Sequence, residues 1–154
     1  MNLSLRKVTT KDLLILYKWA NDRSVRSNSI NKKKILLESH SKWLKKMIHS
    51  NNNFFYIAQI KSIPVGTTRI EKKKNLGYLS YLVDIKFRRK GIGYLMLIKF
   101  LKKIFKKFPN LKIIALVIKK NLVSKKIFNK IGFRILKTNN KTIYFQLTKS
   151  KLKL

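Results

Sequence analysis

Apolar positions recur along the chain with two different periods, which separate expected strands from expected helices. Alternation or a short apolar run indicates a strand, and recurrence every three or four positions indicates a helix. The pattern predicts strands at residues 3–8, 54–60, 65–71, 76–85, 112–118, 134–137 and 142–148. It predicts helices at residues 9–22, 33–50, 93–108 and 121–133, with Thr10 as an N-cap and Gly132 as a helix end.

The order of these elements indicates the fold class. Several strands precede the first strand-to-helix crossover, and a hairpin closes the chain. We therefore expect an α/β (α+β) fold, in which a mixed central sheet of about six or seven strands carries helices on both faces. Residues 1–154 contain no low-complexity linker and no internal repeat, and their apolar content of 45% is typical of one globular domain.

The formal charge of +33, from 38 Lys and Arg against five acidic residues, changes the expected surface. Such a field attracts RNA, DNA and anionic lipid without a specific site. The cations are spread over the whole chain, which favours a solvated basic surface. A basic nucleic-acid-binding module stays as the alternative from a different class, although the aromatic residues follow buried periods and offer no stacking platform.

The chain has no cysteine, which excludes a disulfide framework, a thiolate metal site and a cysteine nucleophile. Its first residues lack the apolar core of a signal peptide, and no apolar stretch approaches the roughly 20 residues that span a bilayer. We expect a cytoplasmic protein with no membrane partner, no metal and no specific nucleic acid. Monomer and homodimer both remain open.

The segment RRKGIG, residues 88–93, joins the predicted strand at 76–85 to the long helix after it. A strand that turns through glycine into a helix gathers unpaired backbone N–H groups at the positive end of the helix dipole, which favours anions. An isolated G-x-G segment is as well explained by a tight turn. It is not a Walker loop or a dinucleotide fingerprint, because the GK[ST] ending and the third glycine are missing.

The segment YLVDIKFRRKGIGYLMLIKFL, followed about thirty residues later by NLVSKKIFNKIGF, resembles the acyl-CoA-binding core of the GNAT superfamily of N-acetyltransferases. The resemblance covers residues 76–136. It implies that residues 1–75 mainly form the acceptor side and that 137–154 form the closing strand and tail. It also implies acetyl-CoA as the co-substrate, whose acetyl group passes to a primary amine by direct attack on the thioester. The implied cofactor-binding residues are Val83, Asp84, Ile85, Arg88, Arg89, Lys90, Gly91, Ile92, Gly93, Tyr94 and Asn121.

In that family the strand matching Val83 to Ile85 pairs with the pantetheine arm, and the loop holds the pyrophosphate. A backbone N–H near Val83 stabilises the oxyanion. The family commonly has a tyrosine, seven residues after the asparagine, that protonates the leaving thiolate, but this chain has Phe128 there. Ser124 is our candidate replacement, with Tyr94 or water as alternatives. Asn121 is equally explained as an N-cap.

The segments KWANDRSVRSNSI, LESHSKWL and PVGTTRI resemble a narrower group of GNAT enzymes. This group acetylates nucleotide-activated 4-amino-4,6-dideoxy sugars in pseudaminic acid and related nonulosonate pathways. The resemblance implies a UDP-linked amino sugar as the small-molecule acceptor, with Arg26, Trp43 and Arg69 as substrate-binding candidates. Trp43 also fits a core position on an amphipathic helix. Ribosomal-protein, peptide and aminoglycoside acetyltransferases share the opening LRKVTTKD…W and remain alternatives.

Attack on the thioester requires a neutral amine, so a nearby group has to accept a proton. His40 titrates near neutrality. Glu71 shares strand parity with Arg69, whereas the side chain of Asp84 is expected to point away from the thioester. We therefore name His40 and Glu71, with Ser124 as the acid, as the catalytic candidates.

Overall fold

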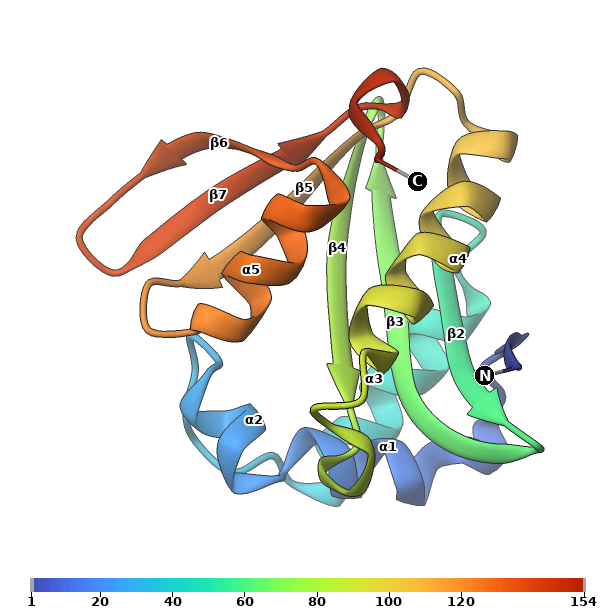
Figure 1. The fold of residues 1–154 in the computed structure, drawn as a ribbon. Coiled ribbons are helices and arrows are strands. Elements are labelled where there is room, and N and C mark those ends of the chain that lie inside the picture. Colours follow the sequence, from blue (N-terminus) through green and yellow to red (C-terminus); the bar gives the residue numbers. More distant parts are fainter. Residues whose placement is uncertain (1, 154) are drawn as a thin grey trace.

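The computed structural model describes residues 2–153, which form a seven-stranded mixed sheet with helices on both faces (Figure 1). The strand order is β1-β2-β3-β4-β5-β7-β6. The strands are β1 (Leu3–Lys7), β2 (Asn53–Ile60), β3 (Ile63–Lys73), β4 (Leu76–Val83), β5 (Lys112–Ile118), β6 (Arg134–Thr138) and β7 (Thr142–Leu147). The helices are α1 (Leu13–Ala20), α2 (Arg23–Ser27), α3 (Leu37–His49), α4 (Ile92–Lys107) and α5 (Leu122–Ile131), with the 3-10 turns η1 (Thr10–Asp12), η2 (Ile85–Phe87) and η3 (Lys149–Lys151). The predicted α/β domain with a mixed sheet is confirmed.

Each face of the sheet has its own apolar core. Helices α4 and α5 cover one face, where Phe100 and Phe128 belong to one buried cluster with Ile70 of β3. Helices α1 and α3 cover the other face, where Leu16 and Leu44 pack against β2. Alternation along β2 serves both cores, because Tyr56 belongs to the core under α4 and α5, whereas Phe55 and Ile57 belong to the core under α1 and α3.

Strands β4 and β5 run parallel but pair over only four residues, from Leu76 opposite Lys112 to Leu79 opposite Ala115. Beyond these pairs the two strands diverge, and the remaining residues of β4 and β5 border a widening gap (Figure 1). Backbone groups along such an edge need another hydrogen-bonding partner. The gap therefore offers a place for an extended ligand inside the sheet.

The first helix differs from its predicted start. The 3-10 turn η1 precedes α1, and the cap is Thr9, so the prediction of Thr10 as the N-cap is wrong by one residue. The cause is Asp12, whose carboxylate accepts the N–H of Thr9 at 2.9 Å. An acid three residues after a threonine completes a capping box, which selects Thr9.

The segment between α1 and α3 also departs from the periodic pattern. Helix α3 begins at Leu37, four residues later than predicted, because Asn21 holds the preceding chain extended. Its side chain accepts the N–H of Ile35 at 2.8 Å and donates to the carbonyl of the same residue at 3.0 Å. Helix α2, which the pattern does not predict, begins after Asp22, whose carboxylate accepts the N–H groups of Ser24 and Val25.

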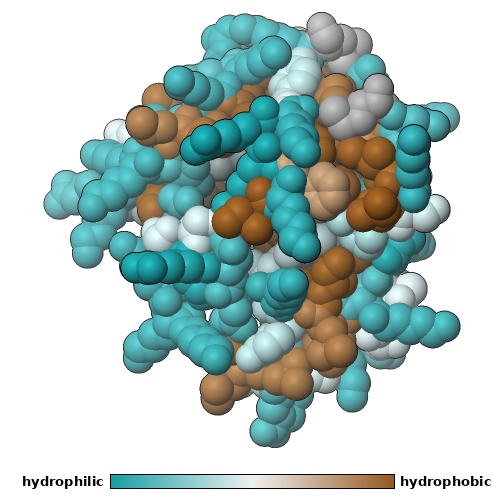
Figure 2. Space-filling model, turned by 60° about the horizontal axis from the view of Figure 1, so that its bottom comes forward, coloured by the Kyte–Doolittle hydropathy of each residue, from teal (hydrophilic) through white to brown (hydrophobic). Residues whose placement is uncertain are grey.

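Hydrophilic side chains spread over most of the face shown in Figure 2, with apolar patches between them. Within residues 2–153, no helix is both long enough and apolar enough to cross a membrane.

Candidate active site

The site begins at the edge of β4 that faces the gap. Asp84, directly after β4, donates its N–H to the carbonyl of Val65 in β3 at 2.9 Å. Backbone N–H groups alternate in direction along a strand, so those of Tyr81 and Val83 point away from β3 and toward the gap. The carbonyl of Val83 points the same way and accepts the Nε–H of Arg88 at 2.9 Å.

The glycine loop leads from η2 into α4. Gly91 is the residue before the helix and has a φ of +73°, in the left-handed region that favours glycine. A Cβ atom at Gly91 would meet no heavy atom within 4 Å, so the space in front of the helix start is open. Ile92 is buried and anchors the start of α4. The free N–H groups of the first turn therefore face open space, which is an arrangement that binds phosphate groups.

Gly93, two residues later, matters for close packing rather than for a left-handed backbone. A Cβ atom there would lie 3.3 Å from Ile127 of α5 and 3.4 Å from Tyr81 and Val83 of β4. The first distance is slightly tighter than an ordinary van der Waals contact, and the other two are at the lower limit of one. Gly93 therefore allows the first turn of α4 to lie close to both β4 and α5.

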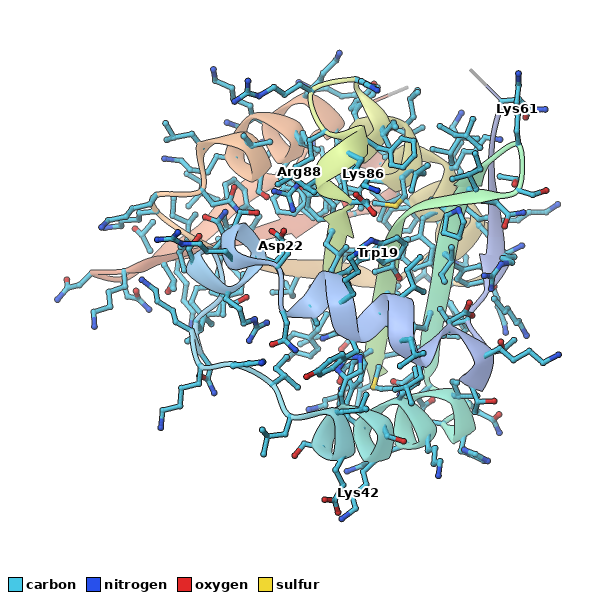
Figure 3. The ribbon with its side chains drawn as sticks, turned by 90° about the horizontal axis from the view of Figure 1, so that it is seen from below. Trp19, Asp22, Lys42, Lys61, Lys86 and Arg88 are labelled. Atoms are coloured by element: carbon cyan, nitrogen blue, oxygen red, sulfur yellow. The ribbon has the colours of Figure 1, made fainter. Side chains whose placement is uncertain are left out.

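The side chain of Arg88 turns away from the loop toward α2 (Figure 3). It donates to the Val83 carbonyl and to the hydroxyl of Ser24, and its Nη2 lies 3.4 Å from the carboxylate of Asp22. The hydrogen bond from Ser24 is the main cause that holds the pKa of Asp22 below its usual value. Arg88 thus ties the end of β4 to α2, whereas Arg89 and Lys90 are exposed beside the loop.

The side chain of Asp84 holds the turn after β4 in place. Its carboxylate accepts the Nε1–H of Trp19 at 2.7 Å and the N–H of Lys86 at 2.8 Å. Figure 3 labels these two donors, Trp19 on α1 and Lys86 in the turn η2. The carboxylate therefore fixes the turn after β4 to α1. The backbone N–H and carbonyl of Asp84 are also in use, bonded to Val65 and Phe87 at 2.9 Å each.

On the other side of the gap, α5 brings two hydroxyl groups together. Asn121 caps the helix by accepting the N–H of Ser124 at 3.1 Å. The buried hydroxyl of Ser124 lies 2.9 Å from the hydroxyl of Tyr81 in β4. Burial raises the pKa of Tyr81, although the hydrogen bond with Ser124 works in the opposite direction. Phe128 is buried one turn further along α5, with its ring 5.8 Å from that of Tyr81.

The candidate bases lie together on the opposite face of the sheet. The ring centroids of His40 and Trp43 are 5.0 Å apart, and the guanidinium carbon of Arg69 lies 5.0 Å from the Trp43 ring. Glu71 forms an ion pair with Arg69 at 3.2 Å. Burial is the main cause that lowers the pKa of His40, followed by the charges of Arg69 and Arg26. His40 is therefore neutral at neutral pH, and its buried Nε2 has no hydrogen-bond partner among the described residues.

The guanidinium of Arg26 forms hydrogen bonds within the N-terminal segment, mainly with the loop between α2 and α3. It donates to the carbonyl of Ala20 at 2.6 Å, to that of Asn31 at 3.0 Å and to the hydroxyl of Ser29 at 3.2 Å. Burial lowers the pKa of Arg26. The structure thus brings His40, Trp43 and Arg69 together but uses Arg26 to hold the neighbouring loop.

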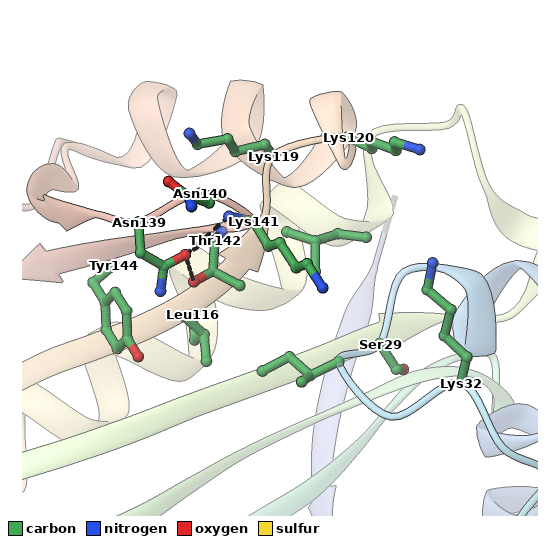
Figure 4. A pocket seen from close by; sticks show the side chains of 12 residues that line it. Ser29, Lys32, Leu116, Lys119, Lys120, Asn139, Asn140, Lys141, Thr142 and Tyr144 are labelled. Atoms are coloured by element: carbon green, nitrogen blue, oxygen red, sulfur yellow. Dashed lines mark hydrogen bonds between the residues drawn. The ribbon is translucent and has the colours of Figure 1, made fainter.

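A cavity of about 900 Å³ opens between the α2–α3 loop and strands β5 and β7 (Figure 4). Leu116 of β5 lines it, while the neighbouring Ala115 and Val117 face the core under α5. The cavity therefore lies on the face opposite α5, directly beyond the last β4–β5 pair. Four of its lining residues are lysines, and no acidic residue is among the described residues that line it: Lys32, Lys119, Lys120 and Lys141.

These features can be compared with known proteins. The sequence model of the acetyltransferase (GNAT) domain family matches residues 2–134, which include β4, the glycine loop and α5. The chain belongs to the GNAT acetyltransferase family. It is therefore an enzyme that transfers acetyl groups. A search of curated proteins found no matching sequence.

Solved GNAT acetyltransferases share this fold over almost the whole chain. The spermidine N-acetyltransferase from Vibrio cholerae, in complex with CoA and spermine, has a TM-score of 0.87 at 16% identity, over 97% of this chain and 96% of its own. The aminoglycoside acetyltransferase AAC(6')-Ib in complex with coenzyme A has a TM-score of 0.81 at 19% identity, over 97% and 96%. A GNAT acetyltransferase from Bacillus anthracis has a TM-score of 0.83 at 20% identity, over 97% and 96%.

Two features of the gap and the cavity carry no motif in the sequence. Tyr81 gave no motif signal, although its position two residues before Val83 places both on one strand face. The four cavity lysines repeat a pattern found over the whole surface, so only their position in the fold distinguishes them. Tyr94, an alternative acid, lies on α4 with the Lys130 amine 4.4 Å from its ring centroid. Among residues 2–153, no three His, Asp or Glu side chains form a group that could hold a metal ion.

Proposed function

We propose that this GNAT enzyme transfers the acetyl group of acetyl-CoA to the primary amine of an anionic, nucleotide-linked amino sugar. The observation that carries the choice of acceptor is the cavity with four lysines and no acidic lining residue among those described. The proposed acceptor is the 4-amino group of a UDP-linked amino-dideoxy sugar, whose diphosphate supplies the negative charge. The proposal rests on the charge of the cavity and on the resemblance of the N-terminal segments.

The residues around the gap fit acetyl-CoA. The backbone groups of Tyr81 and Val83 face the gap and suit the amide groups of a pantetheine arm. The open space at Gly91, the first turn of α4 and the exposed cations Arg89 and Lys90 suit a pyrophosphate. In this proposal residues 76–136 hold acetyl-CoA, and the acceptor cavity takes residues both from the N-terminal part and from β5 to β7.

The charge of the cavity opposes a polycationic acceptor. At an effective dielectric constant of about 20, two unit charges about 8 Å apart interact by about 2 kcal/mol. Several like charges between the cavity and a polyamine therefore weaken binding by orders of magnitude. All five carboxylates of the chain lie elsewhere, in the Arg6, Arg88, Lys42 and Arg69 ion pairs and in the hydrogen bond from Trp19.

In this proposal the same lysines also increase the fraction of the acceptor amine that is neutral and can attack the thioester. Positive charge near an amine lowers its pKa, because it disfavours the ammonium form. A larger share of the bound acceptor is then neutral at neutral pH, and the site depends less on a carboxylate base. His40, which burial keeps neutral, is the proposed proton acceptor through water, and Glu71 is paired with Arg69.

A thiol-release assay tests this function. Acetyl-CoA is supplied with a UDP-linked 4-amino-4,6-dideoxy sugar, spermidine, an aminoglycoside or a ribosomal-protein peptide in parallel reactions. We expect release with the amino sugar. Lys141→Glu should raise KM for it by about thirtyfold or more, since the reversal removes one attraction of about 1–2 kcal/mol and adds a repulsion of similar size. Lys46→Glu, on the exposed side of α3, is the matched charge control. Release with spermidine but not with the amino sugar contradicts the proposed acceptor.

A further inference from the structure

Position 128 of α5, where the GNAT resemblance leads us to expect a tyrosine, has no hydroxyl group to assist the departing sulfur. Phe128 is buried and has no polar atom on its side chain. The ring of Tyr81 packs edge-on against it, with the ring centroids 5.8 Å apart. The phenol of a β4 residue therefore lies beside the aromatic ring of α5.

The position of Tyr81 places this phenol at the gap. Val83, two residues later, presents its backbone to the same edge of β4, and alternation puts both side chains on the α4–α5 face. The ring of Tyr81 lies 3.4 Å from the point where a Cβ of Gly93 would be, so it sits between the first turn of α4 and α5. Its hydroxyl reaches Ser124 across the gap at 2.9 Å.

We propose that Tyr81 is a catalytic residue that donates a hydrogen bond to the thioester sulfur as the thiolate leaves, and that Ser124 is its positioning residue. This inference rests on the proposed use of acetyl-CoA. The hydroxyl group that is missing at Phe128 is thus supplied from β4. Ser124 orients the phenol by donating its own O–H to the Tyr81 oxygen, which leaves the phenolic O–H free to point at the sulfur.

The step balances without a further reactant. The amine nitrogen forms a C–N bond with the carbonyl carbon, the C–S bond breaks, and its electron pair stays on the sulfur. The amine proton passes through water to His40 and from there to solvent, and the thiolate takes up a proton from solvent. A phenol with a pKa of about 10 is a weaker acid than a thiol of about 8.5, so the proton stays on Tyr81. Burial raises the pKa of Tyr81 and keeps it in the donor form.

The titration of bound CoA tests the proposal without any acceptor amine. The ultraviolet absorbance of the thiolate is followed against pH in the complex of the whole protein with CoA. Loss of a hydrogen bond to a charged group should raise the pKa of the bound thiol by about one unit in Tyr81→Phe. Tyr56→Phe is the matched control, because Tyr56 is a buried tyrosine of β2 that packs against Phe100, away from the gap.

A positioning role for Ser124 makes a separate prediction in the same assay. Ser124→Ala should shift the thiol pKa in the same direction by a smaller amount, and Ser124→Thr, which keeps the hydroxyl, should restore it. Calorimetry with CoA checks that each variant still binds. The proposal is overturned when wild-type protein and Tyr81→Phe both bind CoA and their bound thiols titrate at the same pH. Failure of the wild-type protein to bind CoA would instead contradict the proposed function.

Discussion

Gly91 adopts a φ of +73° before α4, and a Cβ atom there would touch nothing in the protein. A side chain at this residue therefore has two separable effects. The first is backbone strain, which is large for a branched residue and small for asparagine. The second is occupation of the open space where we place the pyrophosphate. Two substitutions that both fill the open space, but strain the backbone to different degrees, can separate the two effects.

We expect both Gly91→Val and Gly91→Asn to weaken acetyl-CoA binding by tenfold or more, because each fills the space in front of the α4 N-terminus. Only Gly91→Val should also lower the free energy of unfolding, by about 1–3 kcal/mol. Calorimetry measures the binding and urea unfolding measures the stability. Affinity that survives within about threefold in a folded Gly91→Asn variant would show that the loop is an ordinary turn.

At this scale the sequence predicts residues whose role depends on backbone geometry. Gly91 and Asn121 stand out because a turn and a helix cap restrict which residue types fit. Tyr81 and Lys141 do not stand out, because a tyrosine in a strand and a lysine in a basic chain are ordinary. Their importance comes from what lies opposite them, Ser124 in one case and the α2–α3 loop in the other.

Among the elements, the start of α1 depends on a single buried carboxylate. Asp12 accepts the N–H of Thr9 at 2.9 Å and two bonds from Arg6 at 2.7 and 2.8 Å. Burial works to raise the pKa of Asp12, but the bonds from Arg6 and Thr9 outweigh it and hold the pKa below its usual value. The stability that Asp12 gives to this helix start therefore depends on pH.

Because the pKa of Asp12 is lowered in the folded protein, its contribution to stability decreases in acid. The stabilisation by Asp12 is fully present above its unfolded pKa of about 3.9, and it is lost as the pH falls through the lower folded value. We expect Asp12→Asn to cost about 1–2 kcal/mol at pH 7, a figure limited by the 38% exposure of Arg6. Urea unfolding at neutral and acid pH should show a smaller difference between variant and wild type in acid.

Glu38→Gln is the control for this experiment, because Glu38 forms an exposed pair with Lys42 one turn away in α3. Exposed pairs contribute little, so its effect should stay below about 0.5 kcal/mol at either pH. An equal loss for Asp12→Asn at both pH values would show that the carboxylate charge has no role in the cap.

The elements differ in how far the sequence predicts them. Strand β5 occupies the predicted residues, and α4 ends just before Pro109, because alternation and proline act locally. Helix α2 and the late start of α3 depend on Asp22 and on Asn21, which bond to the backbone of other segments. Periodicity carries no signal for such side-chain bonds.

For the whole molecule, the charge of +33 is a source of self-repulsion. Added salt screens charges that are further apart than about 8 Å at physiological ionic strength. We therefore expect the Tm to rise as sodium chloride is added from very low concentration to about 0.15 M. Calorimetric scans at several salt concentrations measure it, and a Tm that falls over this range would contradict the repulsion argument. Any RNA binding should disappear over the same range.

The four residue pairs that join β4 to β5 are also the only backbone ladder, within the described sheet, between its first four strands and its last three. Few backbone hydrogen bonds therefore hold the two parts of the sheet together at the line where we place acetyl-CoA. A ligand that bonds to both edges of the gap would act there as an added strand and join the two parts.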